Sequence, residues 1–242
     1  MDIGNKQQAR ETVLETLGLS RLVDTSTMDI DLPHHALVER QAVAARFVID
    51  GLTIDAPAGI YHPTVDSSTE FFLRNIRGMK SSAIKSVLEI GAGSGAISLY
   101  VAARWDGVAL KASDISPLAV EAIKHNAAQN DLEIDVVQSD MYERIPKRKY
   151  DLIVFNAPLI DKLPENAIEQ YSLCDPNGTI TRAYLRGAEQ YLAEDGLAIV
   201  SICRNSAYEV LNSIDLRYSV VGFEISYGGF WRAIVGASLP KA

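Results

Sequence analysis

The sequence has few of the features that mark secreted, membrane-spanning or metal-binding proteins. It contains only two cysteines among 242 residues, and Cys174 and Cys203 lie too far apart for a metal-ligand spacing. No run approaches the roughly 18 apolar residues of a membrane span. Residues 1–30 also lack the basic start and apolar stretch of a signal peptide. We therefore expect a cytoplasmic protein with no metal site, no membrane contact and no need for disulfides.

A surplus of positive charge is also missing. The 31 acidic and 23 basic residues give a formal net charge of −8. Because non-specific affinity for nucleic acids comes mainly from Lys and Arg, this balance argues against a nucleic-acid partner. The short basic run at residues 147–149 is typical of a solvated turn. With 48% hydrophobic residues, the chain is long enough for one α/β core plus an appendage.

Residues 87–97 form the most informative stretch, Val-Leu-Glu-Ile-Gly-Ala-Gly-Ser-Gly-Ala-Ile. Alternating glycines permit a sharp turn and a close approach to a ligand, and the following helix start offers unpaired N–H groups. Gly91, Gly93 and Ala96 also fit the dinucleotide pattern G-x-G-x-x-G/A. However, Glu89 would repel a pyrophosphate and suits a cationic α-amino group. The stretch therefore favours S-adenosylmethionine as the cofactor.

The glycine turn, completed by Gly95, resembles motif I of the class I methyltransferases. A second strand ends at Asp114, about 20 residues further on, where a carboxylate can accept hydrogen bonds from both ribose hydroxyls. A third strand over 132–140 ends at Asp140, which the resemblance assigns to the adenine amino group; capping of residues 141–145 is the alternative. The cofactor-binding residues expected from the pattern and the resemblance are Glu89, Gly91, Gly93, Gly95, Asp114, Ile115, Asp140, Met141 and Asn156, with Ile115 and Met141 packing on the adenine ring.

Residues 1–77 are expected to form a separate N-terminal lid. Periodic apolar residues predict helices over 7–17 and 33–47, and Asp50-Gly51 is typical of a tight hairpin turn. Two short helices cannot bury their own apolar stripes, so they must pack on the rest of the protein. They would either cover the substrate or complete the core or a dimer contact.

The segment after the hairpin, residues 58–70, predicts both a helix start and a binding loop. Ser67 and Glu70 have the spacing of a capping box. The segment resembles the Tyr-x-Pro-x-x-Asp and Thr-Glu arrangement that precedes motif I in HemK-type protein-glutamine methyltransferases. There the loop borders cofactor and substrate, which implies four substrate-binding residues: Tyr61, Pro63, Thr64 and Ser68. Packing against the hairpin is the alternative for Tyr61 and His62.

An apolar strand over 150–155 leads into Asn156-Ala157-Pro158-Leu159, at the sheet edge where ligands of open α/β folds lie. The motif resembles the Asn-Pro-Pro-Tyr motif of enzymes that methylate amide or amino nitrogens. In those enzymes the Asn oxygen and the next backbone carbonyl accept hydrogen bonds from the substrate NH2 group. Because methyl transfer depends mainly on alignment, we expect Asn156 to be catalytic and Ala157, Pro158 and Leu159 to bind the substrate.

Two departures from that motif bear on the substrate. Ala157 replaces a proline, and Leu159 replaces the aromatic residue that stacks on a planar amide or base. Stacking contributes about 1–3 kcal/mol per base in nucleic-acid binders, so its loss favours a non-planar amine. Asp161 is a second catalytic candidate that would bind a cationic substrate group or accept its proton, unless it is a solvated loop carboxylate.

The last segments complete a fold prediction. Residues 220–226 and 230–236 flank Tyr227-Gly228-Gly229 as a closing hairpin, which resembles the antiparallel end of methyltransferase sheets. We expect a Rossmann-like seven-stranded α/β sheet over 78–242, preceded by the lid over 1–77. The expected function is S-adenosylmethionine-dependent N-methylation of an amino group in a small molecule or peptide. The alternatives are a protein-glutamine or RNA-base N-methyltransferase, an NAD(P)-dependent oxidoreductase, and a non-catalytic cofactor-binding module.

Overall fold

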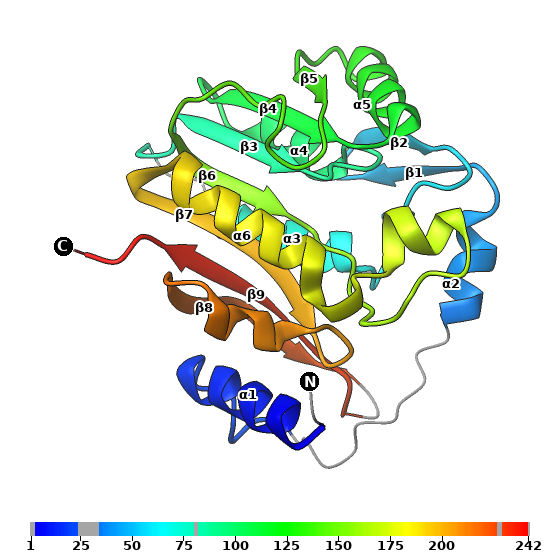
Figure 1. The fold of residues 1–242 in the computed structure, drawn as a ribbon. Helices are drawn as coiled ribbons and strands as arrows, with labels where there is room; N and C mark the ends of the chain where they lie inside the picture. Colours follow the sequence, from blue (N-terminus) through cyan, green and yellow to red (C-terminus); the bar gives the residue numbers. More distant parts are fainter. Residues whose placement is uncertain (1–2, 24–33, 80–81, 227–228, 242) are drawn as a thin grey trace.

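A seven-stranded sheet runs through the centre of the protein (Figure 1). The computed structural model describes residues 3–23, 34–79, 82–226 and 229–241. The strand order is β5-β4-β3-β6-β7-β9-β8, and β9 runs antiparallel to both of its neighbours. This confirms the predicted sheet with its antiparallel last strand, although residues 227 and 228 of the predicted closing turn lie outside the described residues. The strands are β3 (Ser86–Ile90), β4 (Ala109–Asp114), β5 (Asp135–Gln138), β6 (Tyr150–Phe155), β7 (Leu192–Cys203), β8 (Arg217–Ile225) and β9 (Trp231–Ser238).

Helices cover both faces of the sheet, and β6 shows how the core is divided between them. Its side chains alternate, so that Leu152 and Val154 pack on one face while Ile153 and Phe155 pack on the other. The first face is covered by α3 (Ser68–Ile76) and α4 (Ala96–Arg104), and the second by α6 (Thr179–Tyr191). Both faces of β6 are therefore buried over residues 152–155, as this apolar run requires.

The predicted hairpin is present as β1 (Ala45–Ile49) and β2 (Leu52–Ala56). Asp50 and Gly51 have φ values of 53° and 81°, the positive values that a two-residue type I′ turn requires. The predicted helix over 33–47 is shorter than expected: α2 ends at Gln41, and the β-branched and aromatic residues from Ala45 onward pair with β2 instead. Pro33, its expected first residue, lies outside the described residues.

Two asparagines hold the hairpin in place: Asn126 lies in α5 (Pro117–Gln129), and Asn130 is the C-cap of this helix. Asn126 bonds to the backbone N and O of Asp55 at 2.9 and 2.8 Å, and Asn130 bonds to the backbone N and O of Thr53 at 2.9 and 2.7 Å. Asn126 also donates to the carbonyl of Ser94, 2.9 Å away in the glycine turn. The hairpin is therefore tied directly to the turn that follows β3.

The two N-terminal helices lie in different places. The helix α1 (Ile3–Thr16) packs beside the 3-10 helix η4 (Tyr208–Ser213), whereas α2 (His34–Gln41) lies near the hairpin (Figure 1). Val13 and Leu14 near the end of α1, and Leu17 just after it, join the core cluster that includes Leu211 of η4. The predicted lid boundary at residues 77 and 78 stays a prediction. Within the described ranges, no helix is long and apolar enough to cross a membrane.

Candidate active site

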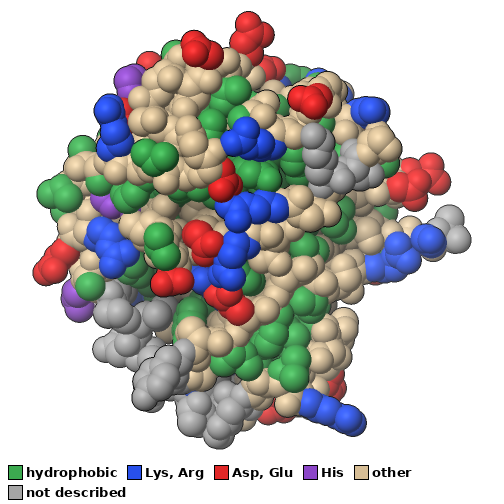
Figure 2. All heavy atoms as spheres, turned by 180° about the vertical axis from the view of Figure 1, so that it is seen from behind, with side chains coloured by type: hydrophobic (Ala, Val, Ile, Leu, Met, Phe, Trp, Pro, Cys, Tyr) green, Lys and Arg blue, Asp and Glu red, His purple; other side chains and the backbone are tan. Residues whose placement is uncertain are grey.

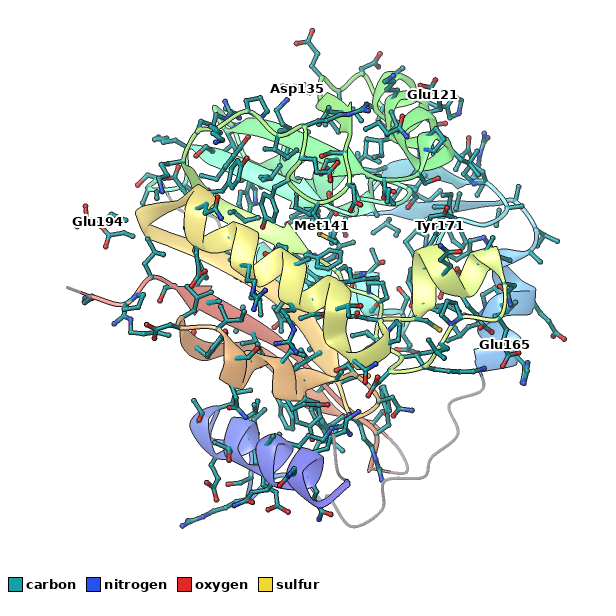
Figure 3. The ribbon with its side chains drawn as sticks, in the orientation of Figure 1. Glu121, Asp135, Met141, Glu165, Tyr171 and Glu194 are labelled. Atoms are coloured by element: carbon teal, nitrogen blue, oxygen red, sulfur yellow. The ribbon has the colours of Figure 1, made fainter. Side chains whose placement is uncertain are left out.

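A cavity of about 750 Å³ opens at the carboxyl edge of the sheet, within the size range of small-molecule sites. Its wall includes the glycine turn, the ends of β4 and β6, residues 59–62 and 64–69, part of α2, and most of the π-helical turn η2 (Glu169–Leu173). Met141, which follows β5, and Tyr171 of η2 both line the cavity, and both are labelled in Figure 3. The cavity therefore joins the segment predicted to bind the cofactor with the segment predicted to carry the chemistry.

The glycine turn needs glycine at two points. Gly91 has φ +61°, and a Cβ there would lie 2.8 Å from Cε2 of Phe155. Gly95 has φ +82°, and a Cβ there would lie 3.2 Å from the side chain of Ile123. Any other residue at these two positions would clash with the neighbouring side chain and would strain the left-handed backbone. Gly91 and Gly93 line the cavity, and α4 begins directly after Gly95 at Ala96.

Asp114 closes the glycine turn from the end of β4. Its Oδ2 accepts the N–H of Gly93 and its Oδ1 accepts the N–H of Ser116, both at 2.9 Å. The residue is buried yet lines the cavity, and burial raises the pKa of its carboxyl group. Each oxygen keeps further acceptor capacity, so the carboxylate can both fix the turn and accept ligand hydroxyls.

Glu89 lies inside the same wall and is 2% exposed. Its carboxyl group bonds to the hydroxyl of Ser98 on α4. Burial raises the pKa of Glu89 to about 8, and the charge of Asp114 acts in the same direction. A buried carboxyl group of this kind is neutral at pH 7 until a cation approaches it. The two acidic groups therefore fit a ligand that brings a positive charge and hydroxyl groups, as S-adenosylmethionine does.

The residues expected around the adenine ring also line the cavity: Ile115, Asp140 and Met141. Ile115 is 45% exposed, so its apolar side chain is available to a ring. The alternative that Asp140 caps a helix is not seen, because residues 141–145 form turns and the carbonyl of Asp140, not its carboxylate, accepts the N–H of Glu143. The adenine contact itself stays a prediction.

Asn156 follows β6 at the centre of the cavity wall, and three hydroxyl groups fix its amide. Its Nδ2 donates to Ser68 Oγ and Thr69 Oγ1, each at 3.2 Å, while Ser201 Oγ donates to its Oδ1 at 3.1 Å. With both Nδ2 hydrogens engaged, Oδ1 keeps one acceptor position for an external N–H group. This arrangement matches the acceptor role predicted for Asn156.

We call residues 157–161 the acceptor loop. Ala157, Pro158 and Leu159 line the cavity as predicted for substrate-binding residues, and Ser201 Oγ lies 3.5 Å from the carbonyl of Ala157. Asp161 is not among the lining residues; its carboxylate pairs with Lys6 and Arg10 of α1. Its catalytic role stays a prediction, and its contacts favour a structural role.

The predicted loop before α3 contributes three of its four candidates to the cavity wall. Tyr61, Thr64 and Ser68 line it, whereas Pro63 is buried and is absent from the lining. The Tyr61 hydroxyl accepts the N–H of Ser68 at 3.4 Å. Next to this loop, Ser67 is confirmed as the N-cap of α3, because its Oγ accepts the N–H of Glu70 at 3.1 Å. The reciprocal bond of a capping box is absent, since the N–H of Ser67 donates to the carbonyl of Thr64 and the carboxylate of Glu70 pairs with Arg74. His62 packs at 5.2 Å from the ring of Phe47, in line with the packing alternative.

The structure also adds residues that sequence reasoning missed. Thr69 and Ser201 hold the amide of Asn156, Asn126 joins the hairpin to the glycine turn, and Tyr171 adds a half-exposed aromatic ring to the cavity. Ser201 had one signal, since it is a lone hydroxyl within the apolar run over 197–203. Tyr171 lies on a π-helical turn that no periodicity predicted.

Comparison with known proteins agrees with this geometry. The family model described as the methyltransferase small domain matches residues 51–222. The release factor glutamine methyltransferase of Fusobacterium nucleatum is 27% identical over 216 residues, which cover 84% of this chain and 60% of that one. The ribosomal RNA small subunit methyltransferase C of Actinobacillus pleuropneumoniae is 34% identical over 106 residues, 43% of this chain and 31% of that one. The composition-based expectation against a nucleic-acid partner is therefore not supported.

A solved structure shows the same fold. The 16S rRNA N2 G1207 methyltransferase of T. thermophilus, in complex with AdoMet and guanosine, superposes with a TM-score of 0.61 and 18% identity. The match covers 81% of this chain and 50% of that chain. This chain thus spans 60% or less of the length of the relatives named above. Since the family model covers more than half of the sequence, from the hairpin to β8, the chain belongs to the methyltransferase small-domain family.

Proposed function

We propose that the chain binds S-adenosylmethionine and transfers its methyl group to a nitrogen atom. The observation that supports this most directly is the fixed amide of Asn156 in the same cavity as Glu89 and Asp114. The cofactor residues are those predicted: Glu89 for the α-amino group, Asp114 for the ribose hydroxyls, and Ile115, Asp140 and Met141 for adenine. The glycine turn would lie along the cofactor, because it carries no side chain that would block a close approach.

When bound, the cofactor supplies a sulfonium methyl group, whose C–S bond breaks as the new C–N bond forms and sulfur keeps the electron pair. The protein's part is alignment. Asn156 Oδ1 and the Ala157 carbonyl would each accept an N–H from the substrate, which leaves the nitrogen lone pair free to point at the methyl group. Positioning of reacting groups supplies much of the catalysis in such a reaction. The proton released by the methylated nitrogen passes to solvent.

For the acceptor we favour an NH2 group on a small molecule or a peptide. Leu159 offers no aromatic face in the motif, and one face of the protein carries interleaved acidic and basic side chains rather than a basic surface (Figure 2). The net charge of −8 points the same way. We also propose that the protein acts in the cytoplasm.

One observation favours a planar acceptor instead, such as a glutamine amide or an RNA base. Tyr171 is 53% exposed and lines the cavity from η2, so its ring is available for the stacking that Leu159 cannot provide. The relatives named above are protein-glutamine and ribosomal RNA methyltransferases, which supports this alternative from a different direction.

A methyl-transfer screen tests the proposal. Purified protein and labelled S-adenosylmethionine would be incubated with amines, short peptides, a bacterial release factor and small-subunit ribosomal RNA, with Asn156→Ala as the control. Incorporation into one class identifies the acceptor. Stabilisation by S-adenosylmethionine but not by NADH would exclude the oxidoreductase alternative. Cofactor binding without methyl transfer to any acceptor would favour the hypothesis of a non-catalytic cofactor-binding module.

A further inference from the structure

Four charged side chains meet at the end of the acceptor loop, and we call them the ion cluster: Lys6, Arg10, Asp161 and Glu209. Lys6 bonds to Asp161 and lies 3.2 Å from Oε1 of Glu209. The Nε of Arg10 lies 2.9 Å from Oε2 of Glu209, and its terminal nitrogen lies 3.7 Å from Oδ2 of Asp161. Each carboxylate therefore faces both cations, and the formal charges balance.

Three of the four side chains in the ion cluster are largely shielded from solvent. The side chains of Arg10, Glu209 and Asp161 are 8%, 9% and 14% exposed, whereas that of Lys6 is 31% exposed. Arg10 also donates to the carbonyl of Ser206 at 2.8 Å and lies over the ring of Tyr208. Solvent and salt screen such pairs less than surface pairs. Removing one member would leave a partner charge uncompensated, so the cluster holds its members in defined positions.

The helix α1 is attached by different means along its length. Its C-terminal half buries Val13 and Leu14 in the core. In the N-terminal half, residues 4, 5, 7 and 8 are exposed, and Lys6 and Arg10 are the charged side chains directed at the rest of the protein. Apolar packing explains why α1 stays folded against η4. It does not explain why its first turns carry two cations toward the acceptor loop.

Asp161 is also the point where the acceptor loop is fixed to other segments. Its backbone N–H donates to the carbonyl of Asn205 at 2.8 Å, and its Oδ1 accepts the N–H of Asn177 at 2.7 Å. Ala157, only four residues earlier, stands where the resembling motif has a proline, so its φ angle is not restricted by a ring. The loop is also held by the N–H of Ile160, which donates to the carbonyl of Leu173 at 2.9 Å, and its Ala157 carbonyl lies 3.5 Å from Ser201 Oγ. Asp161 fixes the loop together with these contacts.

We propose that Lys6 and Arg10 are positioning residues that hold the acceptor loop through Asp161, so that α1 is a brace for the substrate side and not a cover over it. The catalytic consequence of this proposal rests on the proposed function. The holding of the loop does not, because it follows from contacts that need neither cofactor nor substrate.

Matched variants in the full chain separate charge from shape. Lys6→Met removes the cation, Lys6→Arg keeps it, and Asp161→Asn removes the anion while keeping an oxygen for Asn177. Glu11→Gln removes a charge from the exposed side of α1 and serves as the control. Backbone hydrogen exchange over 157–161 and over the glycine turn at 91–95 would be measured by mass spectrometry, with melting temperature and affinity for S-adenosylhomocysteine.

The brace predicts a local effect. Exchange of the amides of Ile160 and Asp161 should rise about tenfold in Lys6→Met and Asp161→Asn, while Lys6→Arg and Glu11→Gln match the wild type and the glycine turn is unchanged. Unchanged exchange over 157–161 in both loss variants would overturn the proposal. So would an equal rise over the whole protein, which would indicate a general loss of stability. Should either variant fail to fold, the other one decides.

Kinetics then test the catalytic consequence with the acceptor that the wild type methylates in the screen. We expect kcat to fall about tenfold in Lys6→Met, with recovery in Lys6→Arg and no change in the KM for S-adenosylmethionine. If kcat stays at the wild-type value although the loop exchanges faster, the positioning role is wrong. If the wild type methylates nothing, the proposed function fails, and the exchange experiment still decides whether α1 holds the loop.

Discussion

The two sides of the cavity are assembled in different ways. The cofactor side comes largely from one continuous stretch, in which β3, the glycine turn, α4 and β4 follow one another between Ser86 and Asp114. The acceptor side joins the end of β6 to residues of α1, α3, η2 and β7, which are far apart in the sequence. A cofactor site of this kind can be kept while the acceptor site changes, because few residues belong to both.

The two sides also differ in whether their polar groups already have partners. On the cofactor side, neighbouring backbone N–H groups and Ser98 hold the buried acidic groups, and a positive charge would come only from the ligand. On the acceptor side, the amide of Asn156 and the carboxylate of Asp161 already have their partners. We therefore expect substitutions on the first side to change cofactor affinity and those on the second side to change turnover.

The largest expected effect is that of Asn156→Ala. Loss of a preorganised hydrogen-bonding group at a reaction centre lowers kcat by about 10²–10³-fold, while cofactor affinity should change little. Turnover and calorimetric binding of S-adenosylhomocysteine measure the two quantities. Gln190→Ala is the control, since Gln190 is exposed on α6 and does not line the cavity. Normal turnover in Asn156→Ala would contradict the expectation that the acceptor side controls turnover.

Asp114→Asn should show the opposite behaviour. An amide cannot accept from both Gly93 and Ser116 as the carboxylate does, and it binds ribose hydroxyls less strongly. A loss of about 1.4–2.8 kcal/mol would weaken cofactor binding by 10–100-fold, with kcat at saturating cofactor nearly unchanged. Asp135→Asn on the edge strand β5 is the control, because Asp135 pairs with Lys111 at an exposed position. Equal affinities for the two variants would contradict the ribose assignment.

The pH dependence of binding sharpens the comparison further. Burial raises the pKa of Glu89 to about 8, so the free protein must release this proton before the carboxylate can face an ammonium group. Cofactor affinity should rise by up to about tenfold per pH unit between pH 6 and 8. Calorimetry in buffers with different ionisation enthalpies would detect the released proton, and Glu89→Gln should remove the dependence. A flat profile in the wild type would contradict the assignment of Glu89.

The same group predicts how stability varies with pH in the free protein. A carboxyl group whose pKa is raised on folding stabilises the fold fully below its unfolded pKa, and that contribution is lost as pH rises through the folded value. From pH 5 to above 8, the melting temperature of the wild type should therefore fall relative to that of Glu89→Gln. Parallel curves would mean that Glu89 ionises normally in the folded state.

The smallest expected effect is that of Ser201→Ala, which tests the fixing of the Asn156 amide. One neutral hydrogen bond contributes about 1 kcal/mol, so kcat should fall about fivefold without a change in cofactor affinity. Ser219→Ala, at an exposed position on β8, is the control. If Ser201→Ala changed cofactor affinity and left turnover unchanged, Ser201 would belong to the cofactor side and not to the acceptor side.

The sequence predicts the cofactor side well because its signals are local. The glycine turn, Asp114, the hairpin turn and the Ser67 N-cap each depend on residues a few positions apart, and all are found where expected. The seven-stranded sheet with its antiparallel last strand follows from the resemblance to the class I methyltransferases.

The acceptor side is harder to predict, because its contacts join residues that are far apart in the chain. Nothing near Asp161 indicates that Lys6 lies against it, 155 positions away, and nothing near Asn156 points to Ser201. The apolar stripe of α1 predicted that the helix would pack, but not where. Propensity also failed beyond Gln41, where pairing between strands replaced the expected helix.

The position of β9 has a consequence for how the protein is made. This strand lies between β7 and β8, and it pairs with β7 from Arg232 to Ala237. During synthesis, β7 and β8 therefore leave the ribosome before β9 does, and the sheet has an open position between them until β9 has emerged. Until then, β7 exposes an unpaired edge that other chains can join. A truncation before Trp231 would therefore leave both β7 and β8 with unpaired edges and make the protein prone to aggregation.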